Sequence, residues 1–292
     1  MPELPEVETV ARAVAPHLVG RSIAAWCQGD KPLRLPLPTA DERRDVVGRR
    51  ILEVWRRAKL LVIELAGRRA VIVHLGMTGT LSVAAKRSRR AKHEHVVLTL
   101  SDGAVLRFRD PRRFGLVRVV RLPAPRTLPP SFAAGLGPEP LGRGFSTTCF
   151  AAACAASARA IKSVIMDNAV VVGVGNIYAA ESLFRARIHP LTPARDLKRP
   201  QVVALRREIV AVLQEAIVAG GTTISDFRTV DGSEGHFSRH LAVYDRAGEP
   251  CERCHTGLIE RVVISGRSSY FCPTCQPAPR KKRGQTPLRP HR

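Results

Sequence analysis

The chain opens with Met1-Pro2-Glu3, a combination of residues that could do covalent chemistry. Removal of the initiator methionine, which the small residue after it normally allows, would make Pro2 a terminal secondary amine. Such an amine is largely unprotonated near neutral pH, and it can attack an electrophilic sugar carbon to form an iminium. Glu3 would supply a neighbouring carboxyl that transfers protons. Taken alone, however, Pro2 and Pro5 could merely stiffen the start of the chain.

Four cysteines form a second pattern with chemical meaning. Cys251, Cys254, Cys272 and Cys275 follow the spacing C-x2-C-x17-C-x2-C, which is typical of a four-thiolate zinc site. Two disulfides are the alternative, but they require an oxidising compartment, and nothing in the sequence indicates export. We therefore predict one zinc ion. Its role would be structural, because four thiolates fill the coordination sphere and leave no position for water.

The charge balance limits the possible partners. Among 292 residues, 47 Lys and Arg against 25 Asp and Glu give a net charge of +22. Such a charge attracts polyanions, either nucleic acid or an anionic membrane. No apolar run is long enough to span a bilayer, and no signal-peptide pattern precedes the start. We therefore expect nucleic acid as the partner, no membrane, and a cytoplasmic, nucleoid-associated protein.

The elements that must position these groups change in type along the chain. Apolar residues recur at helical spacing from residue 5 to 19. Strand patterns follow at 60–65, 70–75, 96–100, 105–108 and 115–122. An Asp-Gly turn at 102–103 predicts a hairpin. Beyond a proline- and glycine-rich stretch, residues 151–166 and 202–218 predict helices.

These patterns predict an α+β chain in which a strand-rich, β-sandwich-like domain precedes a helical domain and a zinc finger. We place the strand-rich catalytic domain at 1–122, a linker at 123–144, the helical DNA-binding domain at 145–240, the zinc finger at 241–277 and a basic disordered tail at 278–292.

Three short segments that contain glycine could contact nucleic acid. The turns HLGMTG (74–79) and DPRRFG (110–115) would expose Met77 and Phe114 beside arginine, a set that can wedge a base stack and replace an extruded base. Alternatively, both side chains could be core residues at strand ends. The segment VVVGVGNIY (170–178) includes Asn176, whose amide could hold a phosphate together with backbone N–H groups. A tight turn between helices would explain that segment equally well.

In this order, PELPEVET, HLGMTG, DPRRFG, MDNAVVVGVGNIYAAESLF and the four-cysteine finger closely resemble bacterial formamidopyrimidine-DNA glycosylase, of the Fpg/MutM family. The resemblance covers about residues 1 to 277. It implies a helix-two-turn-helix arrangement in the helical domain and a monomeric enzyme of base excision repair. It further implies a bifunctional DNA glycosylase and AP lyase that removes 8-oxoguanine and formamidopyrimidines. The partner would be double-stranded DNA with an oxidised base or abasic site, cleaved by β,δ-elimination.

The resemblance also implies roles for particular residues. Pro2 would attack C1′ of the damaged nucleotide, and Glu3 would donate and shuttle protons. Lys59 would contact phosphate and assist β-elimination, and Arg267 would clamp the flanking phosphates and assist δ-elimination. The expected DNA contacts are His74, Met77, His93, Arg112, Phe114, Lys162 and Asn176. Within this set, Met77, Arg112 and Phe114 would fill the space of the extruded nucleotide, and Lys162 would help to handle the damaged purine. Each histidine could instead be satisfied by a hydrogen bond at a strand end.

Several positions depart from the family pattern and bear on lesion preference. Ser163 follows Lys162 where the family commonly has proline, and residues 156–159 lack a lysine run found in some members. Glu234 and His236 lie in the expected lesion-capping loop between 222 and 240, where an acidic residue near DNA is unexpected.

Two alternative functions remain open on the sequence. An enzyme resembling endonuclease VIII would remove oxidised pyrimidines, but Leu4 and the Met77, Arg112 and Phe114 set favour the purine branch. A catalytically silent zinc-finger DNA-binding homologue would have no need of Pro2.

Overall fold

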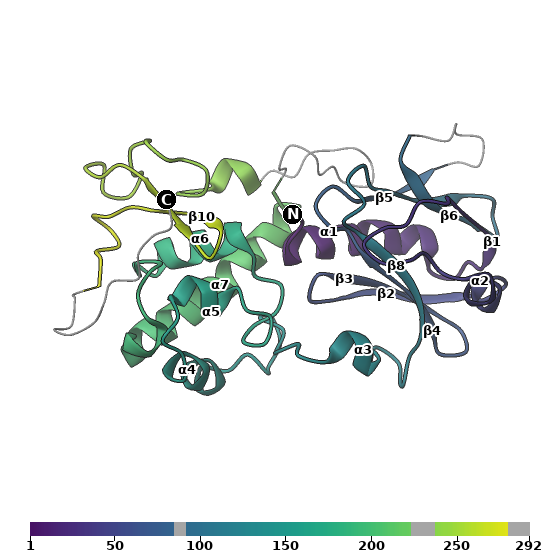
Figure 1. Ribbon diagram of the computed structural model, residues 1–292, viewed down its shortest axis with the longest axis horizontal. Coiled ribbons are helices and arrows are strands. Elements are labelled where there is room, and N and C mark those ends of the chain that lie inside the picture. Colours follow the sequence, from purple (N-terminus) through teal and green to yellow (C-terminus); the bar gives the residue numbers. More distant parts are fainter. Residues whose placement is uncertain (85–91, 223–236, 280–292) are drawn as a thin grey trace. The chain divides into compact units, whose positions relative to one another are not determined.

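The computed structural model describes residues 1–84, 92–222 and 237–279, and the chain divides into two compact units (Figure 1). The first unit comprises Met1–Ala134 and Ala216–Ser238, and the second comprises Gly135–Glu215 and Arg239–Arg292. Glu234, His236 and most of the predicted basic tail lie outside the described residues.

Helix α1 (Leu4–Leu18) opens the first unit. Pro5 lies in its first turn, where a missing N–H costs no hydrogen bond. Val7, Val10, Val14 and Leu18 are buried on one face of α1 and pack in the core of this unit. The predicted helical spacing thus places the beginning of the chain against the core.

Two antiparallel four-stranded sheets form the body of the first unit. One has the order β1-β6-β7-β5 and the other β2-β3-β4-β8. Their bounds are β1 (Ile23–Gln28), β2 (Ile51–Arg57), β3 (Leu60–Leu65), β4 (Arg69–His74), β5 (Thr80–Ala84), β6 (Glu94–Leu100), β7 (Val105–Arg109) and β8 (Leu116–Arg121). Ile63 and Val71 of one sheet share an apolar interior with Leu98 and Phe108 of the other. This arrangement is the predicted sandwich, and β6 and β7 form the predicted Asp-Gly hairpin.

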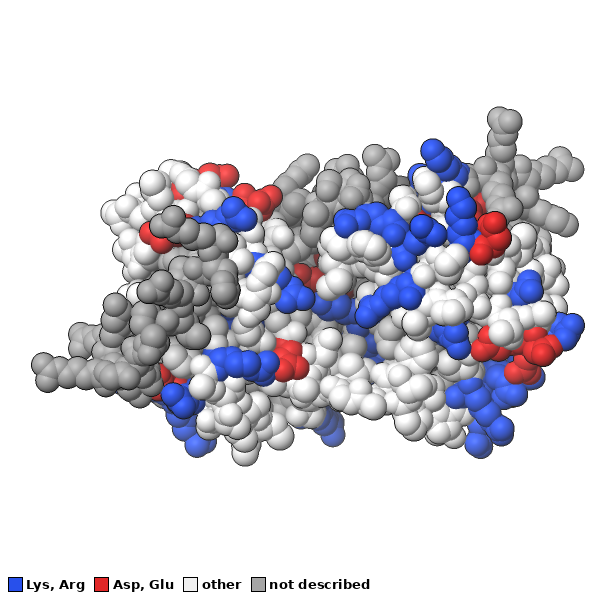
Figure 2. Space-filling view, viewed as in Figure 1, with Lys and Arg blue, Asp and Glu red and all other residues white. Residues whose placement is uncertain are grey.

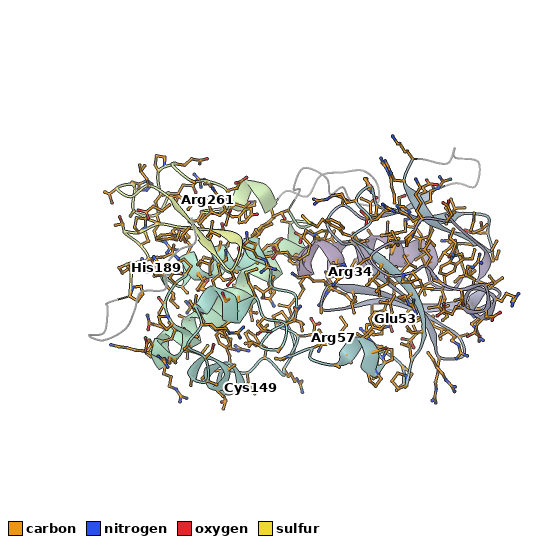
Figure 3. The ribbon with its side chains drawn as sticks, in the orientation of Figure 1. Arg34, Glu53, Arg57, Cys149, His189 and Arg261 are labelled. Atoms are coloured by element: carbon orange, nitrogen blue, oxygen red, sulfur yellow. The ribbon has the colours of Figure 1, made fainter. Side chains whose placement is uncertain are left out.

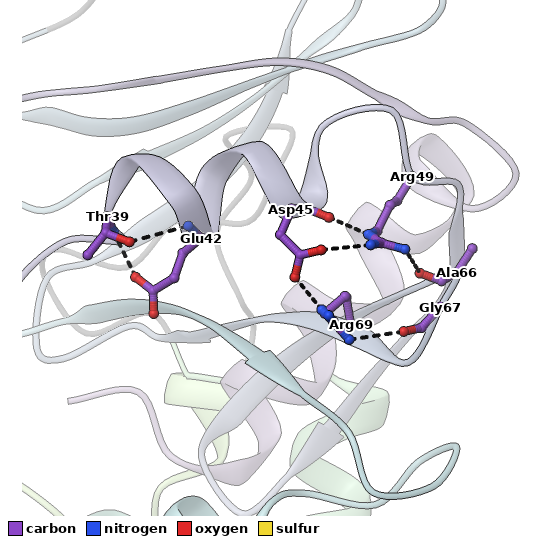
Figure 4. A network of polar contacts seen from close by, with 7 residues as sticks. All are labelled: Thr39, Glu42, Asp45, Arg49, Ala66, Gly67 and Arg69. Atoms are coloured by element: carbon purple, nitrogen blue, oxygen red, sulfur yellow. Dashed lines mark hydrogen bonds and ion pairs between the residues drawn. The ribbon is translucent and has the colours of Figure 1, made fainter.

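Two short helices complete the first unit, α2 (Ala40–Val46) and α3 (Pro130–Ala133). The side chain of Thr39 caps α2 (Figure 4). At the other end of α2, the Asp45 carboxylate accepts hydrogen bonds from Arg49 and Arg69, whose guanidinium groups also donate to the carbonyls of Ala66 and Gly67. This network ties α2 to the turn between β3 and β4.

The second unit begins with helices and ends in a hairpin. Its helices are α4 (Thr147–Ala155), α5 (Ile161–Ile165), α6 (Asn176–Arg185) and α7 (Arg199–Val218, whose last three residues belong to the first unit), with short 3-10 turns at Ala194–Asp196 and Phe237–His240. The finger hairpin pairs β9 (Glu260–Ile264) with β10 (Arg267–Phe271). The expectation of one helix over 151–166 is wrong. The chain leaves the helix after Ala155 because residues 157–161 form backbone hydrogen bonds with Thr192, Ala194 and Arg195.

Aromatic residues and charges are distributed unevenly. Both tryptophans, Trp26 and Trp55, belong to the first unit, and the three tyrosines, Tyr178, Tyr244 and Tyr270, belong to the second. In Figure 2, Lys and Arg side chains cover more of the visible face than Asp and Glu side chains, which appear at both ends of the view. No helix in the described part of the chain is long and apolar enough to cross a membrane.

Candidate active site and nucleic-acid interface

The start of the chain is held in place by a buried carboxylate. Pro2 is buried and Glu3 is only 3% exposed, whereas Met1 is 46% exposed. The backbone N–H of Glu3 donates to Oε2 of Glu6 at 2.7 Å. Oε1 of Glu6 accepts from the N–H of Thr222 at 2.9 Å and from its hydroxyl at 3.0 Å. Glu6 thus joins two segments that are 216 residues apart in sequence.

Glu6 is not among the site residues predicted from the sequence, although its spacing from Glu3 carries a signal. A glutamate three residues after the residue that precedes a helix is the pattern of a capping box, in which the glutamate accepts from a backbone N–H at the helix start. Glu3 and Glu6 have this spacing at the start of α1.

Three nitrogen donors share one neighbourhood of the first unit. Lys59 lies in the two-residue turn between β2 and β3, and His74 is the last residue of β4. Desolvation, together with the nearby charges of Arg34 and Lys59, lowers the pKa of His74 to about 4. His74 is therefore neutral at pH 7. Arg34 lies in the loop before α2 (Figure 3).

The tautomer of His74 follows from its hydrogen bond. Nδ1 accepts from the backbone N–H of Gly76 at 2.9 Å, so the single ring proton is on Nε2, which is a donor. Such a donor suits a phosphate oxygen. His93, the other predicted histidine, is exposed and has φ +67° just before β6.

Asp110 organises the two turns that carry the predicted wedge residues. Its side chain is fully buried. Oδ1 accepts from the hydroxyl of Thr78 at 2.6 Å and from the N–H of Arg112 at 3.2 Å, and Oδ2 accepts from the N–H of Gly115 at 2.8 Å. The backbones of the turns also touch, because a Cβ at Gly76 would lie 2.5 Å from the nitrogen of Gly115. One carboxylate therefore fixes the shape of both turns.

This arrangement leaves the wedge side chains outside the core. Met77 is 40% exposed and Phe114 is 47% exposed. The guanidinium carbon of Arg112 lies 4.7 Å from the centre of the Phe114 ring. The alternative in which Met77 and Phe114 are core residues therefore does not apply. The side chains of Met77 and Phe114 are therefore accessible to a binding partner.

In the second unit a buried lysine plays the organising part. Lys162 of α5 is 1% exposed. Its ammonium donates to Oδ1 of Asn176 at 2.6 Å, to the carbonyl of Ser268 at 3.0 Å and to the hydroxyl of Ser269 at 2.6 Å. The amide of Asn176 also donates to the Ser268 carbonyl, at 2.9 Å. These bonds join α5, the first residue of α6 and the finger strand β10.

The structure thereby brings three of the predicted contact residues of this unit together. Arg267 directly precedes Ser268 and is exposed. A surface pocket is lined by Arg159, Lys162, Ser163, Met166, Asp167, Ile264, Ser265 and Arg267. Ser163, the departure from the family pattern, has its hydroxyl 3.2 Å from that of Ser265. The position therefore forms a hydrogen bond that proline could not form.

The four predicted metal ligands meet in the finger. Their sulfur atoms all lie within 4.8 Å of one another. The Sγ–Sγ distance is 3.9 Å between Cys251 and Cys275 and 3.7 Å between Cys254 and Cys272. Tetrahedral zinc with Zn–S bonds of about 2.3 Å requires sulfur separations of about 3.8 Å, so the geometry fits zinc. Hydrogen bonds from the backbone and side chain of Thr256 lower the pKa of Cys254 to about 5, whereas desolvation raises the pKa of Cys272 and raises that of Cys275 to about 12. A bound zinc ion would favour the thiolate form of its ligands.

A second buried carboxylate, which sequence analysis also missed, attaches the finger to the helices. Glu181 of α6 is 1% exposed and accepts from the backbone N–H groups of Ala242, Val243 and Tyr244 at 2.9 to 3.0 Å. No motif marks it, because its partners are more than 60 residues away.

Comparison with known proteins agrees with this geometry. Family models match the chain in three consecutive parts: the N-terminal domain of formamidopyrimidine-DNA glycosylase at residues 1–117, its H2TH domain at 136–228, and a zinc finger found in FPG and IleRS at 248–278. A formamidopyrimidine-DNA glycosylase from Aliivibrio fischeri strain MJ11 is 46% identical over 276 residues, covering 94% of this chain and 98% of the relative. The chain belongs to the formamidopyrimidine-DNA glycosylase family.

Solved structures of formamidopyrimidine-DNA glycosylases show the same fold. A complex of Lactococcus lactis Fpg with DNA containing an abasic site has a TM-score of 0.85 and 32% identity, covering 94% of this chain and all of that chain. A complex of MutM with DNA containing carbocyclic 8-oxoguanine has a TM-score of 0.86 and 32% identity, covering 95% and all of the respective chains. The predicted resemblance and the predicted α+β fold class are confirmed.

Membership of the formamidopyrimidine-DNA glycosylase family also confirms the predicted function as a DNA glycosylase of base excision repair. Neither the endonuclease VIII-like alternative nor the silent DNA-binding alternative gains support from these comparisons. The roles assigned to individual residues stay predictions.

Proposed function

We propose that the protein excises formamidopyrimidines and 8-oxoguanine from double-stranded DNA and then cleaves the strand at the resulting abasic site as a lyase. The observation that carries this proposal is the buried Glu3–Glu6–Thr222 network, which fixes the residue next to Pro2 in one place. Relatives of the same fold have been solved with abasic-site DNA and with 8-oxoguanine DNA, which supports the substrate class.

The chemistry begins with extrusion of the damaged nucleotide, since C1′ is inaccessible inside a duplex. Unstacking costs a few kcal/mol, and insertion of Met77, Arg112 and Phe114 offsets that cost by filling the vacated space. Their exposure supports this role. The hydrogen bonds of the buried Asp110 would keep the two turns from changing shape when these side chains insert between the bases.

Covalent catalysis then follows from the terminal amine. After removal of Met1, the nitrogen of Pro2 attacks C1′, the bond from C1′ to the base breaks, and the amine proton leaves with the base. Glu3 donates a proton to the ring oxygen O4′, so the sugar opens to an iminium between Pro2 and C1′. Loss of a C2′ proton expels the 3′ phosphate, and a second elimination expels the 5′ phosphate. Water then hydrolyses the remaining iminium, which releases the sugar fragment from Pro2 and leaves a one-nucleotide gap flanked by phosphates.

Cationic and neutral donors of both units would hold the phosphates. In the first unit these are Lys59 and His74, supported by the neutral, donating imidazole. In the second they are Arg267 and Asn176, which are joined through the Lys162 network. His93 is a further proposed contact. A DNA substrate implies that the enzyme works at the nucleoid, and one monomer carries every proposed group.

We propose that a single zinc ion has a structural role in this enzyme. Four cysteine ligands would fill its coordination sphere, and no reaction step uses it. Chelation should weaken DNA binding by at least tenfold, because the strand that carries Arg267 belongs to the finger. Retained affinity in the metal-free protein would contradict this role.

Borohydride trapping tests the central proposal. With a duplex carrying 8-oxoguanine opposite cytosine, reduction should leave a covalent complex, and Pro2→Gly, whose terminal primary amine is mostly protonated at pH 7, should greatly reduce its yield. Asp41→Asn, a change at an exposed residue of α2 that leaves the terminus intact, serves as the matched control for trapping. Trapping with oxidised pyrimidines only would contradict the purine assignment.

The N-terminus gives an independent test. A protein with extra residues before Met1 should bind the duplex but fail to cut it, since Pro2 would remain an amide. Cleavage at the normal rate by a verified extended chain would exclude Pro2 as the nucleophile.

A further inference from the structure

The turn that presents Lys59 is held from inside by a neighbouring arginine. Strands β2 and β3 are joined by two residues, Ala58 and Lys59, with Arg57 opposite Leu60 (Arg57 is labelled in Figure 3). Arg56 extends its side chain along the turn, and its Nη1 donates to the carbonyl oxygen of Ala58 at 2.9 Å. The carbonyl that precedes Lys59 is therefore fixed by a side chain.

The backbone of this turn needs such support. Ala58 has φ +53° and is 4% exposed. The left-handed region is unfavourable for residues that have a Cβ atom, and two-residue hairpins favour glycine at this position. Because alanine lacks the freedom of glycine, a bond to its carbonyl helps to hold the turn in one conformation.

The same guanidinium connects the turn to helix α1. Nε of Arg56 donates to Oε2 of Glu8 at 2.9 Å, and the side chain of Arg56 is only 7% exposed. The other carboxylate oxygen of Glu8 accepts from Nε of Arg12 at 2.7 Å. Glu8 therefore bridges a buried arginine and an exposed one, whose side chain is 66% exposed.

These contacts form a chain from α1 to the turn. Helix α1 begins two residues after Pro2, and Glu8–Arg56–Ala58 joins it to the residue before Lys59. A planar guanidinium binds two acceptors at a fixed angle, which a lysine ammonium cannot reproduce. We propose that Arg56 is a positioning residue, which sets the place of Lys59 relative to the N-terminal residues. This inference rests on the proposed role of Lys59 in elimination.

The substitution Arg56→Lys tests this inference because it keeps the positive charge but loses the planar guanidinium that binds both acceptors. The assay is single-turnover cleavage of a duplex that carries a preformed abasic site. We expect the rate to fall by about ten- to a hundredfold, the scale of loss that follows displacement of a catalytic group by about 1 Å. The dissociation constant for DNA and the melting temperature should change little. Arg12→Lys, the same change on the exposed side of Glu8, is the matched control and should cleave at the normal rate.

A double-mutant cycle with Lys59→Met separates the possible outcomes. If Arg56 acts through Lys59, Arg56→Lys will cause almost no further loss in the Lys59→Met protein. An equal fractional loss in both backgrounds would overturn the inference, since Arg56 would then act independently. A normal rate for Arg56→Lys beside a slow Lys59→Met protein would also overturn it, while leaving the proposed function intact. A normal rate for Lys59→Met would instead refute the proposed role of Lys59.

Discussion

Each unit of the enzyme contains a buried charged side chain that organises its predicted DNA-contacting segments, and the two charges have opposite sign. In the first unit, Asp110 collects donors from the two wedge turns. In the second unit, Lys162 is itself the donor and collects acceptors from α6 and β10. Both groups are almost completely buried.

The sign of each buried charge fits the proposed function of the surface next to it, which is base-stack insertion near Asp110 and phosphate binding near Lys162. A carboxylate can only accept, so it uses the N–H and O–H groups of the turns and leaves apolar Met77 and Phe114 outside. An ammonium can only donate, so it draws the carbonyl oxygens inward beside the exposed Arg267. As a result, fewer hydrogen-bond acceptors of the protein would face a DNA phosphate bound by Arg267.

Loss of the ammonium is the largest expected perturbation. Lys162→Met leaves Oδ1 of Asn176 and two serine oxygens without this donor. At about 1–3 kcal/mol for each unsatisfied acceptor, with partial relief by water, we expect about 4 kcal/mol of destabilisation. Chemical denaturation followed by circular dichroism measures it, and fluorescence anisotropy measures the accompanying loss of DNA affinity. Lys162→Arg, which keeps the charge, should lose less of both; equal losses would show that charge is not the cause.

Removal of the charge of Asp110 should have the next largest effect. In Asp110→Asn the amide NH2 must face a donor, either Gly115 N–H or the Thr78 hydroxyl with Arg112 N–H. We expect about 3 kcal/mol of destabilisation and a greater loss of lesion excision from duplex DNA than of cleavage at abasic sites in single strands. Thr78→Ala, which removes only one donor, should cost about 1 kcal/mol. Equal losses on both substrates would contradict a role for Asp110 in the wedge.

The lowered pKa of His74 should make the free energy of unfolding of the first unit depend on pH. Its pKa is lowered to about 4 in the folded protein, below the ordinary value of 6.5, so the unfolded chain binds the proton more tightly. Stability is therefore full above pH 6.5 and is lost as the pH falls toward 4. Linkage gives a loss of about 2 kcal/mol at pH 5. Denaturation curves at pH 7 and pH 5 should show this difference in the native protein and a smaller one in His74→Asn.

The smallest effect is expected for Asp45, a carboxylate that is only partly buried. Asp45 joins Arg49 and Arg69, but its side chain is 35% exposed. Hydrogen bonds from Arg69 and then Arg49 lower its pKa below 3.8, so its contribution is present above that pH and is lost as the pH falls through the lowered pKa. We expect Asp45→Asn to cost about 1 kcal/mol at pH 7, with unchanged cleavage. A cost as large as that of Asp110→Asn would show that burial is not decisive.

Much of the fold could be predicted because local patterns were strong. The apolar runs at 60–65 and 70–75 correspond to β3 and β4, and the helical spacing at 202–218 corresponds to most of α7. Strand β2 was missed, because Glu53, Arg56 and Arg57 interrupt any simple alternation. The break between α4 and α5 was also missed, because it depends on bonds to residues 192–195.

The site divides in the same way. Cysteine spacing indicated the metal site directly, since its ligands come in close pairs. Glu6 and Glu181 could not be assigned their parts from spacing, because each has partners that are distant in sequence, as with Glu6 and Thr222. Asp110 joins the two wedge turns through Thr78, which lies 32 residues before it. The partial exception is the capping-box spacing of Glu3 and Glu6.

The separation of aromatic residues between the units gives each of them a natural optical reporter. Trp26 and Trp55 emit only from the first unit, and Trp55 is additionally hydrogen-bonded to Glu64 inside it. Tyr178, Tyr244 and Tyr270 emit only from the second, where Tyr244 and Tyr270 stack edge to face beside the finger. Selective excitation of tryptophan therefore follows one half of the enzyme, while tyrosine emission follows the other. Unfolding of the halves can be resolved in an unlabelled protein.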